Sequence, residues 1–247
     1  MIKIVNLVKS FNGQVVLDGI NLELPTGKIT VVIGKSGVGK SVLLKHIVGL
    51  LHPDSGQILV DGQDIAYLRG ASLRAFKLRL AVLFQGGALF DSLSVYENID
   101  FPLREKTRLP EREIAQRVRE RLTQMNLAPE VETKFPDELS GGMKKRVALA
   151  RAMIQEPEIM FFDEPVTGLD PPMTNTVFHL ITKTHQASGY TALMVSHDIP
   201  EVFSVAHQVA MLHQGRIIAA GTPEEIQSHS DPMVQSFIRG EVDFLEA

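Results

Sequence analysis

A glycine-rich segment at residues 34–41, with the sequence GKSGVGKS, constrains this chain more than any other feature. Two glycines separated by four residues and followed by Lys-Ser form the pattern of a phosphate-binding loop, and here an apolar run precedes the pattern and a helix-like stretch follows it. The glycines let the backbone turn its N–H groups towards an anion, and the start of the helix adds the positive end of its dipole. The segment therefore predicts a polyphosphate site; the alternative is a glycine-rich turn with a solvated lysine.

The side chains and the main chain of this loop have separate predicted roles. Lys40 can reach the β- and γ-phosphates, and the hydroxyl of Ser41 can serve as a Mg²⁺ ligand. The other predicted contacts to the phosphates come from Gly34, Lys35, Ser36, Gly37, Val38 and Gly39.

Composition restricts the class of protein. The chain has 247 residues, enough for one large domain, and its net charge of −4 argues against a broad nucleic-acid footprint, so we expect no nucleic-acid partner. The absence of cysteine excludes disulfides and thiolate metal sites. No apolar run approaches the roughly 18 residues of a membrane-spanning helix, so we expect a soluble, cytoplasmic chain that reaches a membrane only through a partner.

The residues before the loop read as β-strands. Residues 2–8 and 15–24 are separated by the turn Asn12-Gly13, which predicts an antiparallel β-layer at the N-terminus. Phe11 lies at this turn, where its ring either stacks on a purine or serves as a packing residue, and both interpretations stay open.

Polar residues follow two apolar runs further along the chain. Residues 159–162 predict a strand that is buried on both faces and ends in Asp163 and Glu164. Because ligands of parallel sheets lie at the carboxyl ends of the strands, we expect Asp163 to bind Mg²⁺ and Glu164 to orient or deprotonate a water molecule. His197 follows the strand at 191–195, at the same edge, where it can donate to a γ-phosphate. The alternative for the two carboxylates is an ordinary surface position.

Residues 88–155 change to a helical pattern, which predicts an inserted helical subdomain. Gln85 precedes it at the end of the strand at 81–84, where its amide can touch Mg²⁺ or the attacking water. An apolar cluster stands at the start of this region and is either core or a docking surface for a partner. The cluster consists of Leu89, Phe90, Leu93 and Val95.

A second helix start has the features of an anion site. Ser140 stands at the position of an N-cap, and Gly141 and Gly142 offer bare N–H groups in the first turn. The alternative is an ordinary capped helix with a basic, solvated face made of Lys144, Lys145, Arg146 and Arg151.

These residues, in this order, resemble the nucleotide-binding subunit of ATP-binding cassette (ABC) systems over essentially the whole chain. GKSGVGKS is similar to the Walker A motif of the family, LSGGM at 139–143 to its signature, IMFFDE at 159–164 to Walker B and GLD at 168–170 to the D-loop. Gln85 resembles the Q-loop glutamine and His197 the switch histidine, and Phe11 lies where the family stacks adenine.

The resemblance implies an α/β fold: a RecA-like P-loop NTPase core with an N-terminal antiparallel β-subdomain and an inserted helical subdomain. The expected boundaries are 1–87 and 156–235 for the β-subdomain and core, 88–155 for the helical subdomain and 236–247 for a C-terminal tail.

The resemblance also implies a head-to-tail homodimer that binds ATP and Mg²⁺ between Walker A of one subunit and the signature of the other. Ser140, Gly141 and Gly142 then hold the γ-phosphate bound by the partner subunit, and Asp170 of the D-loop joins the nucleotide-binding residues. The implied catalytic residues are Glu164, His197 and Gln85, and the implied metal ligands are Ser41, Gln85 and Asp163.

Two stretches, 84–99 and 139–152, further resemble the ATP-binding subunit of Mla/Mce-type phospholipid transport systems of Gram-negative bacteria. This implies a transmembrane permease, an Mce-type substrate-binding protein and a small accessory subunit as partners, at the cytoplasmic face of the inner membrane. Met143 replaces the usual Gln, and Val166-Thr167 replaces the frequent Thr-Ser, which leaves the phosphate contacts intact but the substrate open.

Three alternatives remain. A soluble ABC ATPase that serves an assembly scaffold, such as iron–sulfur cluster assembly, also carries the basic GGxKKR pattern in its signature. An ABC ATPase for another solute has the same motifs. A small-molecule kinase with the same loop is disfavoured because Glu164, His197 and the signature would have no function in it.

Overall fold

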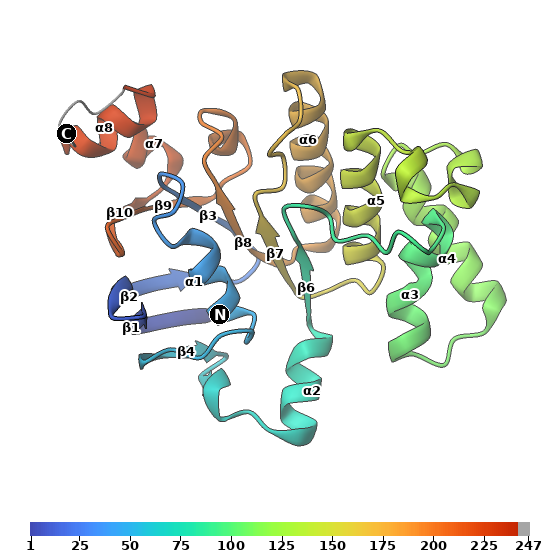
Figure 1. The fold of residues 1–247 in the computed structure, drawn as a ribbon, viewed down its shortest axis with the longest axis horizontal. Helices are drawn as coiled ribbons and strands as arrows, with labels where there is room; N and C mark the ends of the chain where they lie inside the picture. The colour runs from blue at the N-terminus through green and yellow to red at the C-terminus, as the bar shows by residue number, and fades with distance from the viewer. Residues whose placement is uncertain (242–247) are drawn as a thin grey trace. The chain divides into compact units, whose positions relative to one another are not determined.

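The computed structural model describes residues 1–241, which form two compact units (Figure 1). The first unit combines Met1–Leu73 with the chain from Thr191 onward, and the second unit is Arg74–Tyr190. No helix within residues 1–241 is both long and apolar enough to cross a membrane. Of the predicted C-terminal tail, 236–239 belong to a helix, whereas 242–247 lie outside the described residues.

The first unit contains an antiparallel sheet in the order β2-β1-β4-β5. The sequence Asn12-Gly13 forms the β1–β2 turn with φ values of 50° and 82°, the left-handed conformation that hairpin turns require. Pairing continues to the last residue of β1, where Phe11 lies opposite Gln14, so Phe11 is in the strand and not in the turn. The strands are β1 (Ile2–Phe11), β2 (Gln14–Leu24), β4 (Ser55–Val60) and β5 (Gln63–Asp64).

A second sheet of the first unit has the order β10-β9-β3-β8, in which β3 runs parallel to both β8 and β9. All residues of β3 and β8 are buried, as their continuous apolar sequences predict. The strands are β3 (Ile29–Ile33), β8 (Thr191–Ser196), β9 (Gln208–His213) and β10 (Arg216–Gly221), and the helices are α1 (Lys40–Ile47), α7 (Pro223–Gln227) and α8 (Pro232–Arg239).

The second unit contains the parallel strands β6 (Leu80–Leu83) and β7 (Ile159–Asp163) and contains the whole predicted helical subdomain. Its helices are α3 (Val95–Lys106), α4 (Glu111–Gln124), α5 (Gly141–Met153) and α6 (Pro171–Ser188), and α2 (Gly70–Leu78) precedes β6. Short 3₁₀ helices lie at Ile65–Tyr67, Pro129–Thr133, Pro136–Glu138 and Glu201–Ser204. The prediction of an α/β chain with an N-terminal antiparallel layer is confirmed.

One buried histidine in the first unit predicts sensitivity to acid. His46 of α1 has no exposed surface, and its Nδ1 lies 2.7 Å from the carbonyl oxygen of Val42. Burial lowers the pKa of His46; backbone hydrogen bonds with Val42 and His52 oppose this shift, and among the smaller effects Lys9 reinforces it and Asp54 opposes it.

We therefore expect the free energy of unfolding to fall as the pH drops below about 6.5, because the unfolded chain binds the histidine proton more readily than the folded chain. His46→Leu should reduce this loss, measured as the shift of the urea midpoint between neutral and mildly acidic buffer. The matched control His179→Leu replaces an exposed histidine and should keep the wild-type dependence. An unchanged dependence in His46→Leu would contradict the prediction.

Candidate functional site

The glycine-rich loop leaves β3 and enters α1 in a space that admits only glycine at two positions. A Cβ atom on Gly34 would collide with the main-chain oxygen of Leu212 in β9. Gly39 has φ 105°, and a Cβ atom there would lie 3.1 Å from atoms of Val16 and Leu17 in β2. The sequence predicts that these glycines let the backbone turn. The structure adds that β9 and β2 pack directly against the loop.

Lys40 is the first residue of α1 and is 6% exposed. Its ammonium group donates to the main-chain oxygens of Gly34 at 2.7 Å and Lys35 at 3.0 Å. The charge therefore lies inside the loop, and the loop is not a turn with a solvated lysine. Gly39 caps the helix without a side chain, so the first N–H groups of α1 can serve an anion.

His197 lies beside the start of this loop. Ile33 pairs with Ser196 in the parallel β3–β8 ladder, so Gly34 and His197 are each the first residue beyond the carboxyl ends of neighbouring strands. The side chain of His197 is exposed. The expected arrangement of strand ends is therefore present in the first unit.

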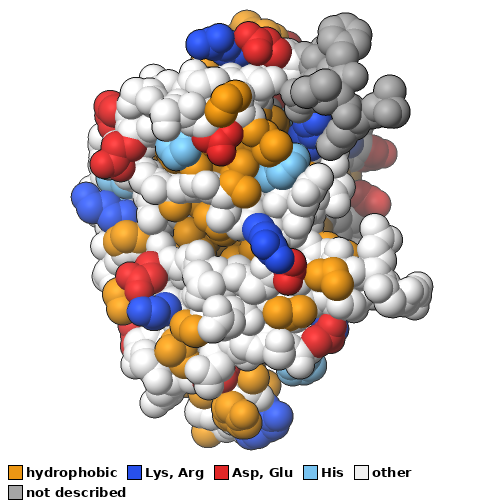
Figure 2. All heavy atoms as spheres, turned by 90° about the vertical axis from the view of Figure 1, so that its left-hand side faces the viewer, with side chains coloured by type: hydrophobic (Ala, Val, Ile, Leu, Met, Phe, Trp, Pro, Cys, Tyr) orange, Lys and Arg blue, Asp and Glu red, His pale blue; other side chains and the backbone are white. Residues whose placement is uncertain are grey.

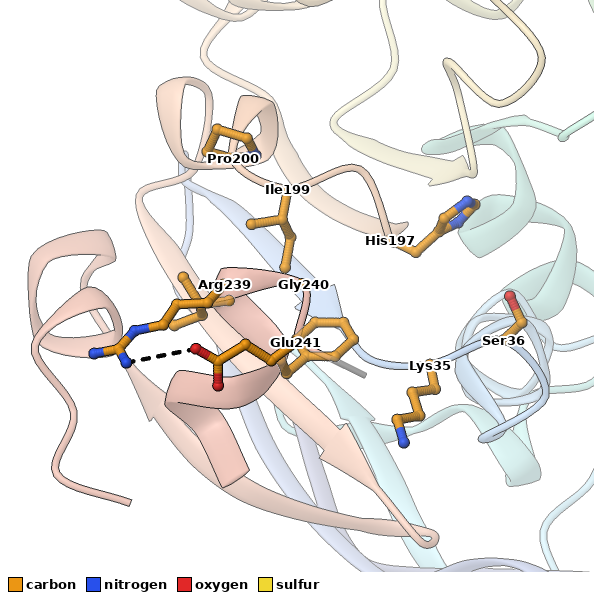
Figure 3. Close-up of a pocket in the computed structure, with 10 residues that line it drawn as sticks. Lys35, Ser36, His197, Ile199, Pro200, Arg239, Gly240 and Glu241 are labelled. Carbon is orange, nitrogen blue, oxygen red and sulfur yellow. Dashed lines mark ion pairs between the residues drawn. The ribbon is translucent and has the colours of Figure 1, made fainter. Parts of the chain in front are cut away.

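A cavity of about 500 Å³ opens on this edge of the first unit (Figure 3). Lys35 and Ser36 of the loop line it together with His197, and Ile199 and Pro200 follow on the same segment. The end of α8 contributes the other wall, where Arg239 and Glu241 form an ion pair at 3.6 Å. On the face of the molecule shown in Figure 2, basic and acidic side chains are interspersed.

Phe11 presents an aromatic ring near the loop. The ring is 42% exposed, and the ammonium group of Lys9 lies 5.3 Å from its centroid. The same hairpin brings Val16 and Leu17 against Gly39, so the end of the hairpin lies next to the phosphate-binding loop. An exposed ring in this place is compatible with base stacking and is not part of the core.

In the second unit, the structure brings Gln85, Asp163 and Glu164 to one sheet edge. Leu83 pairs with Phe162 in the parallel β6–β7 ladder, so the residues after both strands emerge side by side. Asp163 is 8% and Glu164 7% exposed, whereas the side chain of Gln85 is exposed. The alternative of two solvated surface carboxylates is therefore wrong.

Glu164 adopts a conformation that is uncommon for a residue with a side chain. Its φ of 50° lies in the left-handed region, which is strained for a residue with a side chain. Such a conformation persists only if contacts with surrounding residues stabilise it. The hydroxyl of Thr167 donates to its carboxylate at 3.1 Å, and the ammonium of Lys145 lies 3.4 Å from its main-chain oxygen. The direction of this carboxylate is thus fixed by neighbours on both sides of the residue.

The second helix start has the predicted cap. The hydroxyl of Ser140 accepts a hydrogen bond from the N–H of Met143 at 3.3 Å, and Ser140 and Gly141 are exposed. Gly142 is buried, and a Cβ atom on it would lie 2.5 Å from the sulfur of Met173 in α6. A side chain at this position would therefore have to displace the flexible end of Met173.

Asp170 has a structural role that the sequence did not assign. It caps α6, where its carboxylate accepts from the N–H of Met173 at 2.8 Å and two prolines occupy the first turn. Met173, in the turn of α6 that Asp170 caps, packs on Gly142. This contact connects α5 to the segment at 168–170 within the second unit.

Sequence reasoning missed Thr167 and Lys145. The alternative of a basic, solvated face on this helix is wrong for Lys145, which is only 7% exposed. A signal was present: Lys145 shares helical spacing with Ala148, Leu149 and Ala152, which are buried on the same face of α5.

Comparison with known proteins agrees with this geometry. The model of a family described as ABC transporter matches residues 17–167. The intermembrane phospholipid transport system ATP-binding protein MlaF of Haemophilus influenzae is 42% identical over 243 residues, which are 98% of this chain and 92% of that protein. The protein of the same name from Escherichia coli K12 is 41% identical over 228 residues, or 92% of this chain and 84% of that protein.

Two solved structures are similar over most of the chain. The dimeric, post-hydrolysis structure of an ATP-binding cassette with ADP and Pi has a TM-score of 0.82 at 28% identity, covering 90% of this chain and 99% of that chain. CbiO1 from Clostridium perfringens, part of an ABC transporter complex, has a TM-score of 0.83 at 32% identity, covering 96% of this chain and 94% of that chain.

Proposed function

Because this chain belongs to the ABC transporter family and is an ATPase of that family, we propose that it energises phospholipid transport between Gram-negative membranes through a separate permease. The observation that carries this proposal is the 42% identity to a phospholipid transport ATP-binding protein over 98% of this chain. Family membership also confirms the predicted resemblance and the expected fold class of an ABC cassette.

Within this proposal, each loop residue acts on ATP through chemistry that its position supports. Lys40 places its ammonium group, now on the oxygens of Gly34 and Lys35, against the β- and γ-phosphates. His197 donates to the γ-phosphate, and Phe11 stacks on adenine. The remaining phosphate contacts are the main-chain N–H groups of the loop from Gly34 to Ser41.

Glu164 acts as the base or orienting group for the attacking water, since its buried carboxylate is held by Thr167 at 3.1 Å. Gln85 contacts this water or the metal. Ser41, Gln85 and Asp163 would hold Mg²⁺, because hydroxyl, amide and carboxylate oxygens are the donors that this ion prefers. Bound there, Mg²⁺ would neutralise charge on the phosphate oxygens.

The proposed ATP-bound state is a head-to-tail homodimer. Exposed Ser140 and Gly141, with the N–H groups of the first turn of α5, would hold the γ-phosphate of the ATP bound by the partner subunit. Asp170 would lie in the same dimer contact. A similar cassette that was solved as a dimer with ADP and Pi supports this arrangement.

The proposed assembly contains the ATPase dimer, a transmembrane permease, an Mce-type substrate-binding protein and a small accessory subunit. In this assembly the chain lies at the cytoplasmic face of the inner membrane and is attached through the permease. Recovery with membrane permease chains and ATP-dependent transfer of phospholipid between vesicles would support the proposal. Recovery with soluble scaffold proteins instead would favour the assembly-scaffold alternative, with its basic signature.

The apolar cluster divides into core and surface. Val95 has no exposed area and belongs to the core, whereas Phe90 is 42% exposed. Its ring lies 4.8 Å from that of Phe101, itself 38% exposed, and the guanidinium of Arg151 lies 5.5 Å from the Phe90 ring. We propose that this exposed aromatic pair receives a helix of the permease.

Phe90→Glu should therefore abolish co-purification with the permease and leave the fold intact. The backbone of Phe90 keeps its bonds to Asn98, at 2.9 Å through the N–H and 3.0 Å through the oxygen, whatever its side chain is. The matched control Tyr67→Glu replaces an aromatic residue that is 78% exposed and should not affect co-purification. Loss of thermal stability in Phe90→Glu, with the complex retained, would assign Phe90 to packing.

A further inference from the structure

Lys145 is a buried cation on the helix that begins at the signature turn. It is 7% exposed, and its ammonium group donates to the main-chain oxygen of Gln85 and lies 3.4 Å from that of Glu164. Gln85 and Glu164 are far apart in the sequence and follow different strands. One side chain therefore contacts the main chain of both segments whose side chains are proposed to handle the water and the metal.

A second cation of α5 holds the next part of the same loop. Arg151 donates to the main-chain oxygen of Gly87 at 2.7 Å, and a Cβ atom on Gly87 would lie 3.2 Å from that of Ala148. The segment at 85–87 is thus pressed against α5 and tied to it at two carbonyl groups. Charge-assisted hydrogen bonds of this kind are stronger than neutral ones, which suits a fixed anchor.

The contact to Glu164 matters because of the conformation of that residue. With φ 50°, Glu164 depends on its surroundings to keep its carboxylate in place. Thr167 fixes the carboxylate, and Lys145 lies against the carbonyl of the same residue. A displacement of about 1 Å at a reacting group can lower the rate on the order of a hundredfold. We therefore expect the rate of hydrolysis to depend on the contact that Lys145 makes here.

We propose that Lys145 is a positioning residue that holds the main chain of Gln85 and that of Glu164 in fixed positions. Through Lys145, the helix that begins at the signature turn would position the water-handling groups of its own subunit. This inference rests on the proposed hydrolytic role of Glu164. Lys145 stands about one helical turn beyond Gly141, so a shift of α5 on phosphate binding at its N-terminus reaches both carbonyl groups directly.

Lys145→Met tests this in the full chain within the assembly that it forms. It keeps the length and apolar stem of the side chain and removes the ammonium donor. We expect kcat for ATP hydrolysis to fall by about tenfold to a hundredfold, with the ATP affinity changed by less than about threefold. Amide exchange should become faster at 85–87 and 164–167 in particular.

Lys144→Met is the matched control, since Lys144 is the adjacent lysine on α5 and its side chain makes no hydrogen bond or ion pair within residues 1–241. It should match the wild type in kcat and exchange. If Lys145→Met did not fold, Lys145→Leu, which also lacks a donor, would be measured by the same criteria.

A kcat for the Lys145 variant within about twofold of the Lys144 variant would overturn the proposal. A uniform rise of exchange throughout the second unit would also overturn it, because that result describes general packing. If the wild-type protein had no ATPase activity, the hydrolytic role of Glu164 would be refuted instead. Amide exchange at 85–87 and 164–167 in the Lys145 variant would then still test the positioning role, because it needs no turnover.

Discussion

Replacing Glu164 by Gln is expected to lower ATP turnover by about a hundredfold to ten-thousandfold, the range that loss of a general base produces. The substitution conserves size, and the amide oxygen can still accept the hydrogen bond that Thr167 donates at 3.1 Å. The ability to take a proton from water is what disappears. ATP affinity should stay within about threefold of the wild-type value, because binding depends on the loop and on Lys40.

An ATP-bound dimer should accumulate in the Glu164→Gln variant, since the step that releases it is blocked. Size-exclusion chromatography with bound nucleotide measured in each peak tests this directly. The control Glu130→Gln makes the same chemical change at an exposed position on a 3₁₀ helix and should hydrolyse ATP normally. Wild-type turnover in Glu164→Gln would remove Glu164 from the catalytic role.

Lys40→Ala should act on binding itself. A charge-assisted hydrogen bond contributes about 1.5 to 3 kcal/mol, so loss of the phosphate contacts of Lys40 should weaken ATP binding by about tenfold to a hundredfold or more. The variant also loses the bonds that hold the ammonium group to Gly34 and Lys35, at 2.7 and 3.0 Å. Titration with a fluorescent ATP analogue gives the affinity.

The control for this experiment lies on the same helix. Lys45→Ala truncates an exposed lysine in the last turn of α1, so general effects on helix propensity are matched. It should bind ATP like the wild type. An affinity for Lys40→Ala within about twofold of the control would show that the buried ammonium serves the loop conformation only.

The strands, and the residues that follow them, were predictable because local signals agree there. Apolar runs such as Phe161-Phe162 end at Asp163, and the parallel ladder then places the next residues at one edge. The cap at Ser140 and the turn at Asn12-Gly13 also follow from single residue types with strong backbone preferences.

Contacts between distant segments were not predictable. Helical spacing indicates that Lys145 shares the buried face of α5, but it does not show that this lysine contacts the main chain of Gln85 and Glu164. The hydrogen bond from Arg151 to the main-chain oxygen of Gly87 likewise joins residues that are 64 positions apart in the sequence. Such contacts arise from tertiary structure, which residue spacing describes only in part.

The packing of Leu212 against Gly34 has a consequence for anyone who edits the C-terminal third of this chain. The floor under the phosphate-binding loop is a strand about 180 residues further along, and the β9–β10 turn is tied back to β2 by the bond from the N–H of Asp18 to Gly215 at 2.8 Å. Insertions or truncations in the β9–β10 hairpin are therefore expected to change the conformation of the phosphate-binding loop, although the hairpin is distant from the loop in the sequence.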